Sequence, residues 1–189
     1  MMGTAAPAWH ALMVRGWVVA AAYLGVVLLA MAPLVHAALT PPAWLVYLCG
    51  PAYMAHQVEE HWGDRFRHFV NDRVLGGRDA LTTNAIWWIN VPGVWGVNLA
   101  ALYGAVTFGE DAGLVAPYLM LVNAVGHGAA ALRFGYNPGL VTALLLFLPL
   151  GMVTLLTISA SFAAHAVGLS IAVLIHLAII GFIIIRARA

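Results

Sequence analysis

Six long apolar runs determine what this chain can fold into. A helix rises about 1.5 Å per residue and the hydrocarbon core of a bilayer is about 30 Å thick, so about 20 apolar residues form one span. Because 63% of the 189 residues are hydrophobic and only 8% are charged, a soluble fold would lack the polar residues needed to cover its core. We therefore expect an all-α polytopic membrane protein, a compact bundle of six transmembrane helices at residues 16–38, 42–62, 84–107, 113–133, 139–160 and 164–185.

Short polar turns separate these runs. The sequence TPP at residues 40–42 divides the first two, and YNPG at residues 136–139 divides the fourth and fifth. Polar residues between 159 and 165 divide the last two, because residues 139–185 would otherwise form one run too long for a single span. The sequence has no internal repeat and no linker, which predicts a single domain over residues 1–189.

The basic residues, all eight of which are arginine, predict the orientation. With six spans, all of them fall on one side of the membrane, and the other side carries only Glu110 and Asp111. Because basic loops favour the cytoplasmic side, we expect the N and C termini to be cytoplasmic. The net charge of +1, without a clustered basic face, indicates no nucleic-acid partner.

A short amphipathic segment follows the second run. Trp62, Phe66, Phe69, Val70 and Val74 recur in it at helical spacing, with arginines and other polar residues between them. This pattern predicts a helix at residues 63–75 that lies in the cytoplasmic interface with its aromatic side in lipid. Two interpretations stay open, a solvated helix without a further role and a helix that binds lipid headgroups.

The sequence HQVEEH at residues 56–61 places acidic and imidazole side chains at the end of an apolar run. A charge at the centre of a transmembrane helix costs about 2.5–3.5 kcal/mol, so Glu59 and Glu60 require a proton, a metal ion or a cation from another helix. At about 100° per residue, His56, Glu59 and Glu60 share one helix face, whereas His61 points away from them. We therefore expect the first three to face the interior.

Other polar side chains lie at the same depth in neighbouring predicted helices. His56, Asn90 and His127 each lie six residues, or about 9 Å, from the cytoplasmic end of their helix. Asn123 lies one turn deeper than His127 on the same helix face. The spacing thus predicts one polar level shared by three helices.

Imidazoles and carboxylates from two helices form a ligand set for zinc, iron or manganese. The predicted ligands are His56, Glu59, Glu60 and His127. A divalent metal ion, zinc or iron first, would act as a Lewis acid, and Glu59 and Glu60 are the predicted catalytic residues, the spare one acting as general base. In the alternative interpretation both glutamates lie at the headgroup boundary, in water or paired with Arg65 or Arg133, and the histidines hydrogen-bond between helices.

Residues 56–60, HQVEE, resemble the signature of the HXXEE family of small bacterial integral membrane proteins. Residues 123–139, NAVGHGAAALRFGYNPG, resemble the second characteristic segment of that family. The resemblance covers the second to fifth runs and implies an enzyme of the bacterial cytoplasmic membrane whose reaction the motifs do not specify. It adds Asn123, Tyr136 and Asn137 to the supporting polar residues, beside Asn90, and Gly139 suits a tight turn.

The leading hypothesis is a metal-dependent membrane hydrolase that acts on a lipid or another hydrophobic molecule near the cytoplasmic leaflet. A non-haem iron oxidoreductase is the first alternative, although di-iron sites draw on more carboxylates than this membrane interior contains. A metal-cation or proton transporter could use the same carboxylates as a relay. A structural subunit, in which the polar cluster only fixes helix packing, is the remaining alternative.

Overall fold

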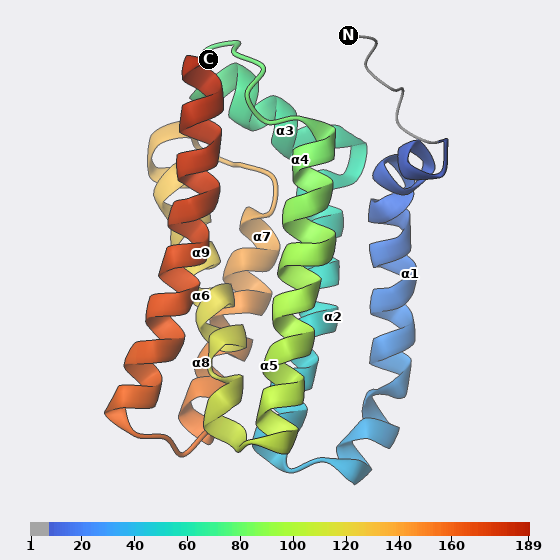
Figure 1. Ribbon diagram of the computed structural model, residues 1–189, viewed down its shortest axis with the longest axis vertical. Helices are drawn as coiled ribbons and strands as arrows, with labels where there is room; N and C mark the ends of the chain where they lie inside the picture. The colour runs from blue at the N-terminus through green and yellow to red at the C-terminus, as the bar shows by residue number, and fades with distance from the viewer. Residues whose placement is uncertain (1–7) are drawn as a thin grey trace, which may run out of the picture.

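The computed structural model describes residues 8–189, and every regular element in this range is helical, which confirms the all-α prediction (Figure 1). The first part comprises α1 (Ala8–Ala38), α2 (Pro41–His61), η1 (Trp62–Asp64), α3 (Arg65–His68) and η2 (Phe69–Val74). A third long segment joins α4 (Thr83–Trp88), η3 (Ile89–Trp95) and α5 (Gly96–Thr107). The remainder comprises η4 (Glu110–Gly113), α6 (Val115–Phe134), α7 (Leu140–Thr142), η5 (Ala143–Phe147), α8 (Leu148–Thr157) and α9 (Phe162–Arg188).

Five helical segments are long and apolar enough to cross a membrane, so the expectation of six spans is met for five. They are Ala8–Ala38, Thr83–Thr107, Glu110–Phe134, Leu140–Thr157 and Phe162–Arg188. The predicted span that is absent from this group is α2, which is less apolar because five of its six residues from 56 to 61 are polar. Twelve of its 21 residues are buried, so α2 is covered mainly by neighbouring helices, and its role as a sixth span stays a proposal.

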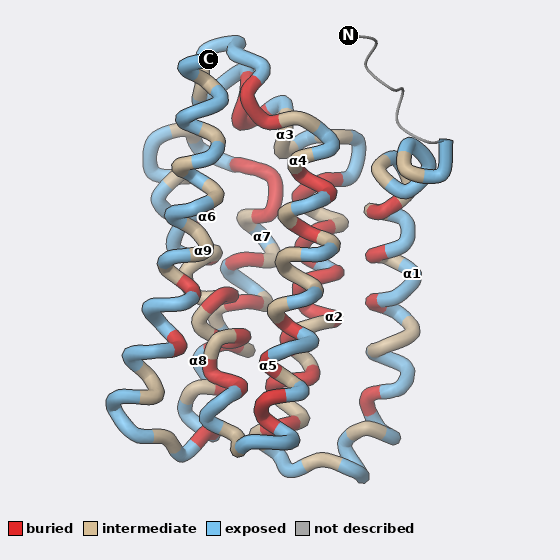
Figure 2. The backbone as a smooth tube through the Cα atoms, in the orientation of Figure 1, coloured by how far each residue is buried: buried red, intermediate tan, exposed pale blue. Residues whose placement is uncertain are grey.

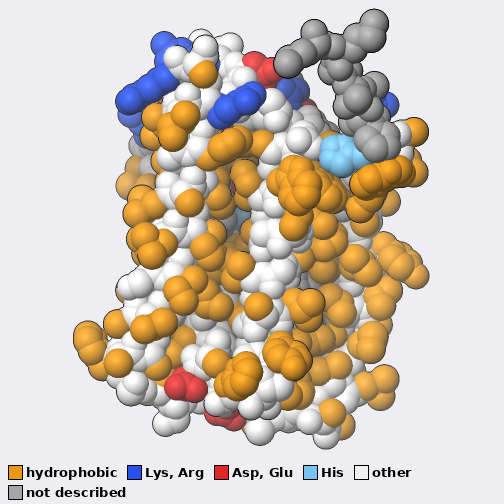
Figure 3. Space-filling view, in the orientation of Figure 1, with side chains coloured by type: hydrophobic (Ala, Val, Ile, Leu, Met, Phe, Trp, Pro, Cys, Tyr) orange, Lys and Arg blue, Asp and Glu red, His pale blue; other side chains and the backbone are white. Residues whose placement is uncertain are grey.

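The long segments run alternately in opposite directions. The start of α1, the C-terminal end of α9 and the α3 region lie at the same end of the molecule, at the top of Figure 1. The arginine side chains in view gather at this end (Figure 3). We call it the arginine-rich end; its placement on the cytoplasmic side stays a prediction.

Side-chain caps explain where two of the helices begin. The Thr40 hydroxyl accepts a hydrogen bond from the Ala43 amide, and proline at the first helical positions of α2 needs no amide partner. The Ser161 hydroxyl accepts from the Ala164 amide at the start of α9. The sequence break near residue 160 is therefore a true helix boundary.

The core surrounds α2, whose length is mostly buried, whereas α1 and α9 expose most of their surface (Figure 2). Val46, Cys49 and Tyr53 of α2 pack with residues of the other helices, including Leu119 of α6 and Phe147 of η5. Helix α1 packs on α2 alone for most of its length, and its carbonyl groups accept hydrogen bonds from Trp44 and Tyr47. The motif helix is thus the central element of the bundle.

The amphipathic segment after α2 is helical, but the prediction that its aromatic side lies in lipid is wrong. Phe69 and Val70 are buried and pack with Leu81 and Ile86 of the protein itself. Asn71 holds the segment against the bundle, because its side chain donates to the Leu81 carbonyl and accepts from the Leu81 amide. The segment therefore closes the arginine-rich end of the bundle.

Candidate functional site

Three buried side chains from two helices converge in the interior of the bundle, in the last turns of α2 and of α6. His56 and Glu60 lie one turn apart on α2, and His127 faces them from α6. One ligand atom from each lies within 4.8 Å of the other two. Glu60 Oε2 is 3.6 Å from His56 Nε2, and Glu60 Oε1 is 3.4 Å from His127 Nε2. The exposed fraction of each of these residues is 6% or less.

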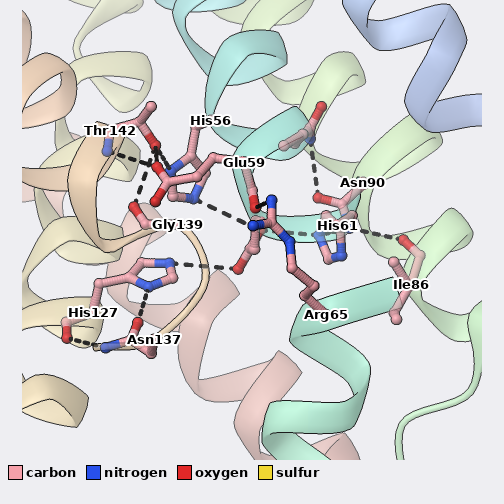
Figure 4. Close-up of polar contacts among 12 residues, drawn as sticks. His56, Glu59, His61, Arg65, Ile86, Asn90, His127, Asn137, Gly139 and Thr142 are labelled. Atoms are coloured by element: carbon pink, nitrogen blue, oxygen red, sulfur yellow. Dashed lines mark hydrogen bonds and ion pairs between the residues drawn. The ribbon is translucent and has the colours of Figure 1, made fainter. Parts of the chain in front are cut away.

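The hydrogen bonds of Asn137 determine which nitrogen of His127 carries the proton. Asn137 Nδ2 donates to the His127 carbonyl over 3.0 Å, and Asn137 Oδ1 lies 2.6 Å from His127 Nδ1 (Figure 4). Because this amide oxygen can only accept, His127 Nδ1 is the donor. In the neutral imidazole, Nε2 then presents its lone pair toward Glu60.

Thr142 determines in the same way which nitrogen of His56 carries the proton. The Thr142 hydroxyl donates to Glu59 Oε2 over 2.5 Å and lies 2.8 Å from His56 Nδ1. Since the hydroxyl has a single proton, it accepts the hydrogen bond from His56 Nδ1. His56 Nε2 therefore also presents a lone pair toward Glu60, and this buried atom has no hydrogen-bond partner within residues 8–189.

Two imidazole lone pairs and a carboxylate facing one another repel unless a cation or protons lie between them. Two histidines and one glutamate, with both outer nitrogens held by hydrogen bonds, form a ligand set that suits a divalent metal ion. The described residues thus fit a mononuclear metal site formed by His56, Glu60 and His127. The structure brings together three of the four predicted ligands.

The fourth predicted ligand, Glu59, lies outside this group. Its Oε1 accepts from the Val141 amide and the Tyr136 hydroxyl, and its Oε2 accepts from the amide and hydroxyl of Thr142. Glu59 therefore holds the start of α7 against α2 (Figure 4). The two neighbouring glutamates of the motif have different tasks, one facing the imidazoles and one binding the backbone of α7.

The expectation that His61 points away from the site is wrong. His61 Nε2 lies 2.9 Å from Glu60 Oε2, and the ring packs against Trp17 and Phe66. The helical-wheel argument failed because α2 ends at His61, where the backbone departs from helix geometry with φ −108° and ψ −7°. The Asn90 amide Nδ2, which can only donate, lies 3.3 Å from the same His61 Nε2, so the amide and the carboxylate compete for this nitrogen.

Asn90 lies at the predicted level and joins a chain of buried amides. It accepts from Gln57 Nε2 over 2.9 Å and donates to the Ile86 carbonyl, while Trp95 donates to Gln57 Oε1. Asn90 occurs in η3, a stretch of π-helix around Pro92. Proline lacks the amide of a regular turn, and such π-helical stretches are frequent at functional sites.

The turn between α6 and α7 presses its backbone against both imidazoles. Gly139 has φ +96°, and a Cβ there would lie 2.7 Å from His127 Cε1 and 2.8 Å from His56 Cε1. Tyr136 of the same turn is exposed, and desolvation together with the Glu59 charge raises its pKa above the ordinary value. Tyr136 therefore stays protonated and donates to Glu59.

Sequence reasoning missed Thr142, Gln57 and Trp95. Gln57 stands inside the HQVEE motif, and Thr142 follows the YNPG turn by three residues. For Gln57 and Thr142, a polar side chain in or next to a motif was the available signal. Their partners are 86 residues away for Thr142 and 38 away for Trp95, so only the tertiary structure identifies them.

A cavity of about 440 Å³ adjoins the three ligands. Its walls include Tyr53, Asn123 and His176, and Asn123 Oδ1 and Tyr53 Oη are buried without a hydrogen-bond partner in the described residues. His176 Nδ1 donates to the Ala172 carbonyl over 2.8 Å. Most of the remaining wall is aliphatic or aromatic, so the site opens into an apolar space with a few polar groups.

The comparisons with known proteins agree with the motif. No curated protein and no solved structure matches the chain. The family described as "Protein of unknown function with HXXEE motif" matches residues 47–154, which hold all three converging side chains and Glu59. Because the match spans more than half of the sequence, the chain belongs to the HXXEE family.

Proposed function

We propose that this protein is a membrane-embedded, metal-dependent enzyme, a hydrolase whose metal ligands are His56, Glu60 and His127. The observation that carries the proposal is the pair of imidazole lone pairs directed at one buried carboxylate, with His56 Nε2 lacking a hydrogen-bond partner among the described residues. A site designed only for helix packing would satisfy that nitrogen with a donor. A metal ion satisfies all three groups at once.

The number of carboxylates favours a mononuclear site. Glu59 is engaged by four hydrogen bonds from the α6–α7 turn and α7, which leaves Glu60 as the single carboxylate among the converging ligands. Di-iron sites use several carboxylates. Two histidines and a glutamate occur in catalytic zinc sites and also in non-haem iron sites.

A bound divalent metal would supply Lewis-acid activation of water and of a polar substrate group. The protein's own contribution is orientation and proton handling. Thr142 and Asn137 fix the imidazoles, and His61 Nε2 lies 2.9 Å from Glu60 Oε2. We assign proton transfer in the hydrolytic step to His61, because Glu60 is taken as a ligand and the His61 side chain lines the cavity beside it.

The substrate is proposed to be hydrophobic because the cavity beside the ligands is mostly apolar. With five helices able to cross a membrane, such a molecule would reach the site from lipid. We propose that the site lies toward the cytoplasmic leaflet of a bacterial inner membrane, since it is nearer the arginine-rich end.

Metal content tests the proposal. Wild-type protein purified without chelator should contain about one equivalent of zinc or iron by elemental analysis, and Glu60→Gln and His127→Ala should lose it. His68→Ala is a matched control, because His68 lies on the exposed side of α3 near Asp72. Wild-type protein that never retains zinc, iron or manganese would refute the proposal.

A non-haem iron oxidoreductase is the second candidate, favoured by the same combination of two histidines and one carboxylate. The identity of the retained metal separates the two. Zinc supports hydrolysis, whereas iron together with substrate-dependent oxygen consumption supports oxidation.

A further inference from the structure

Helix α9 encloses the cavity from one side without closing it. The helix packs closely on the start of α6, where Gly168 leaves room for Leu114 and Tyr118. Further along, Ile175, Ile179 and Ile183 recur at intervals of four residues and face the cavity. The opposite wall is formed by residues of α4 and η3, which include Ile86, Ile89, Asn90 and Val94. A seam between α9 and the α4–η3 segment therefore borders the cavity (Figure 3).

The outer side of the same seam carries a groove. Ile89 and Ile179 line both this groove and the cavity, so one pair of side chains separates the two spaces. The groove also contains Asn84, Trp88 and Arg186. The residues that line it include no aspartate or glutamate, and Arg186 has no ion pair within residues 8–189. A positive charge thus stands at the outer rim of an apolar passage.

Distances along the helices relate the rim to the candidate metal site. Arg186 lies ten residues after His176, or about 15 Å along α9. Asn84 lies six residues before Asn90, or about 9 Å along the α4–η3 segment. A molecule with its head at Arg186 must therefore extend a chain of about 9–15 Å along the isoleucines to reach the level of the ligands.

We propose that the seam binds a single-chain amphiphile with an anionic head, which enters from the lipid phase. Arg186 binds the head, Ile179 and Ile89 pack against the chain, and the chain lies in the cavity beside His56 and His127. The cavity volume of about 440 Å³ lies within the range of about 300–1,000 Å³ typical of small-molecule sites. This inference deepens the proposed function and rests on it for the reaction, but the binding can be measured separately.

Photolabelling tests the binding. The probe is palmitic acid with a diazirine at its chain end, and the neutral comparison is the corresponding alcohol with the same diazirine. In wild-type protein the acid should give saturable labelling at Ile175 and Ile179, the isoleucines of the cavity wall that are farther from Arg186. Labelling that only follows exposure to lipid, for example at Leu177 or Ile185, and that does not saturate would overturn the proposal.

Two glycines of α6 provide a matched pair of variants. A Cβ at either Gly126 or Gly128 meets no atom within 4 Å, so both positions accept a side chain. Gly126 lines the cavity and Gly128 does not. Gly126→Leu should weaken the saturable labelling by about tenfold or more, whereas Gly128→Leu should leave it unchanged. Equal effects of the two variants would contradict the proposed position of the chain.

Two arginines of α9 test whether Arg186 binds the anionic head of the amphiphile. Arg186→Gln should weaken labelling by the acid and leave labelling by the alcohol unchanged, and Arg188→Gln should affect neither, since Arg188 does not line the groove. Loss of acid labelling to the same extent in both variants would show a general surface charge effect and refute the specific role of Arg186.

Metal analysis of the same preparations separates this inference from the proposed function. Saturable labelling in protein without metal would leave the binding site standing and refute the enzyme proposal. Metal-loaded protein without saturable labelling would leave the enzyme proposal standing and refute the proposed binding of the amphiphile. Gly126→Leu should retain its metal, because it changes the cavity wall and none of the three ligands.

Discussion

The Thr142 hydroxyl lies 2.8 Å from His56 Nδ1 and 2.5 Å from Glu59 Oε2, so one residue of α7 connects two residues of the HQVEE motif on α2. The carboxylate accepts the hydroxyl proton, the hydroxyl accepts the imidazole proton, and the imidazole is left with a free Nε2. Glu59 thus acts on the candidate metal site indirectly, through Thr142. This relation gives the motif a physical explanation, since Glu59 holds the Thr142 hydroxyl that orients the His56 ring.

Thr142→Val should weaken metal binding about 10- to 100-fold, the usual effect of removing a group that orients a ligand. The variant keeps the shape of the side chain and the backbone amide that donates to Glu59. Competition with a chromophoric chelator measures the affinity. Thr142→Ser should stay close to wild type, and Thr157→Val is a control because the Thr157 hydroxyl donates to the Val153 carbonyl of its own helix. Equal affinities of Thr142→Val and wild type would disprove the orienting role.

The two motif glutamates should respond differently to the same isosteric change. Glu60→Gln replaces the single carboxylate among the ligands and should remove bound metal. Glu59→Gln keeps an oxygen acceptor for α7 and should retain most of the metal with lower thermal stability. Elemental analysis and thermal unfolding in detergent measure both quantities. If Glu59→Gln lost metal as completely as Glu60→Gln, Glu59 would have to be a ligand, as the sequence suggested.

Gly139→Ala should disrupt the site more than the same change at another glycine of the turn. Gly139 and Gly135 both have positive φ, and forcing alanine into such a conformation costs about 1–3 kcal/mol. At Gly139 the new Cβ would also meet both imidazoles, whereas at Gly135 it meets no atom within 4 Å. Both variants should unfold at lower temperature, and Gly139→Ala alone should lose metal. Similar metal content in the two would show that the rings can move aside.

The sequence was sufficient for the parts of this structure that depend on local periodicity. Apolar length predicted the long helices, although α1 begins near residue 8 and not near 16. Depth along the helices related His56 to His127, which lie on different helices and are 71 positions apart. Both arguments succeed because a membrane imposes one length scale on every helix.

The remaining features depend on tertiary contacts that no local pattern encodes. Glu59 and Glu60 are adjacent, and the helical wheel assigned both to the interior; the docking of α7 separates their roles. His61 turned toward Glu60 because α2 ends there. The aromatic side of residues 66–70 faced protein and not lipid because Asn71 ties this segment to Leu81.

Removal of metal should destabilise the wild-type protein and not the Glu60→Gln variant, which lacks one of the three proposed metal ligands. A metal ion that binds only the folded state adds about 2.7 kcal/mol when its free concentration is one hundred times its dissociation constant. Chelator should therefore lower the unfolding temperature of wild type, and added zinc or iron should restore it. Glu60→Gln should unfold at the same temperature with and without chelator, because it lacks the carboxylate that completes the site. The Arg188→Gln variant serves as control and should shift as wild type does. An unfolding temperature of wild type that does not respond to chelator or to added metal would show that the three groups are held together by protons, and the helix-packing interpretation would replace the enzyme.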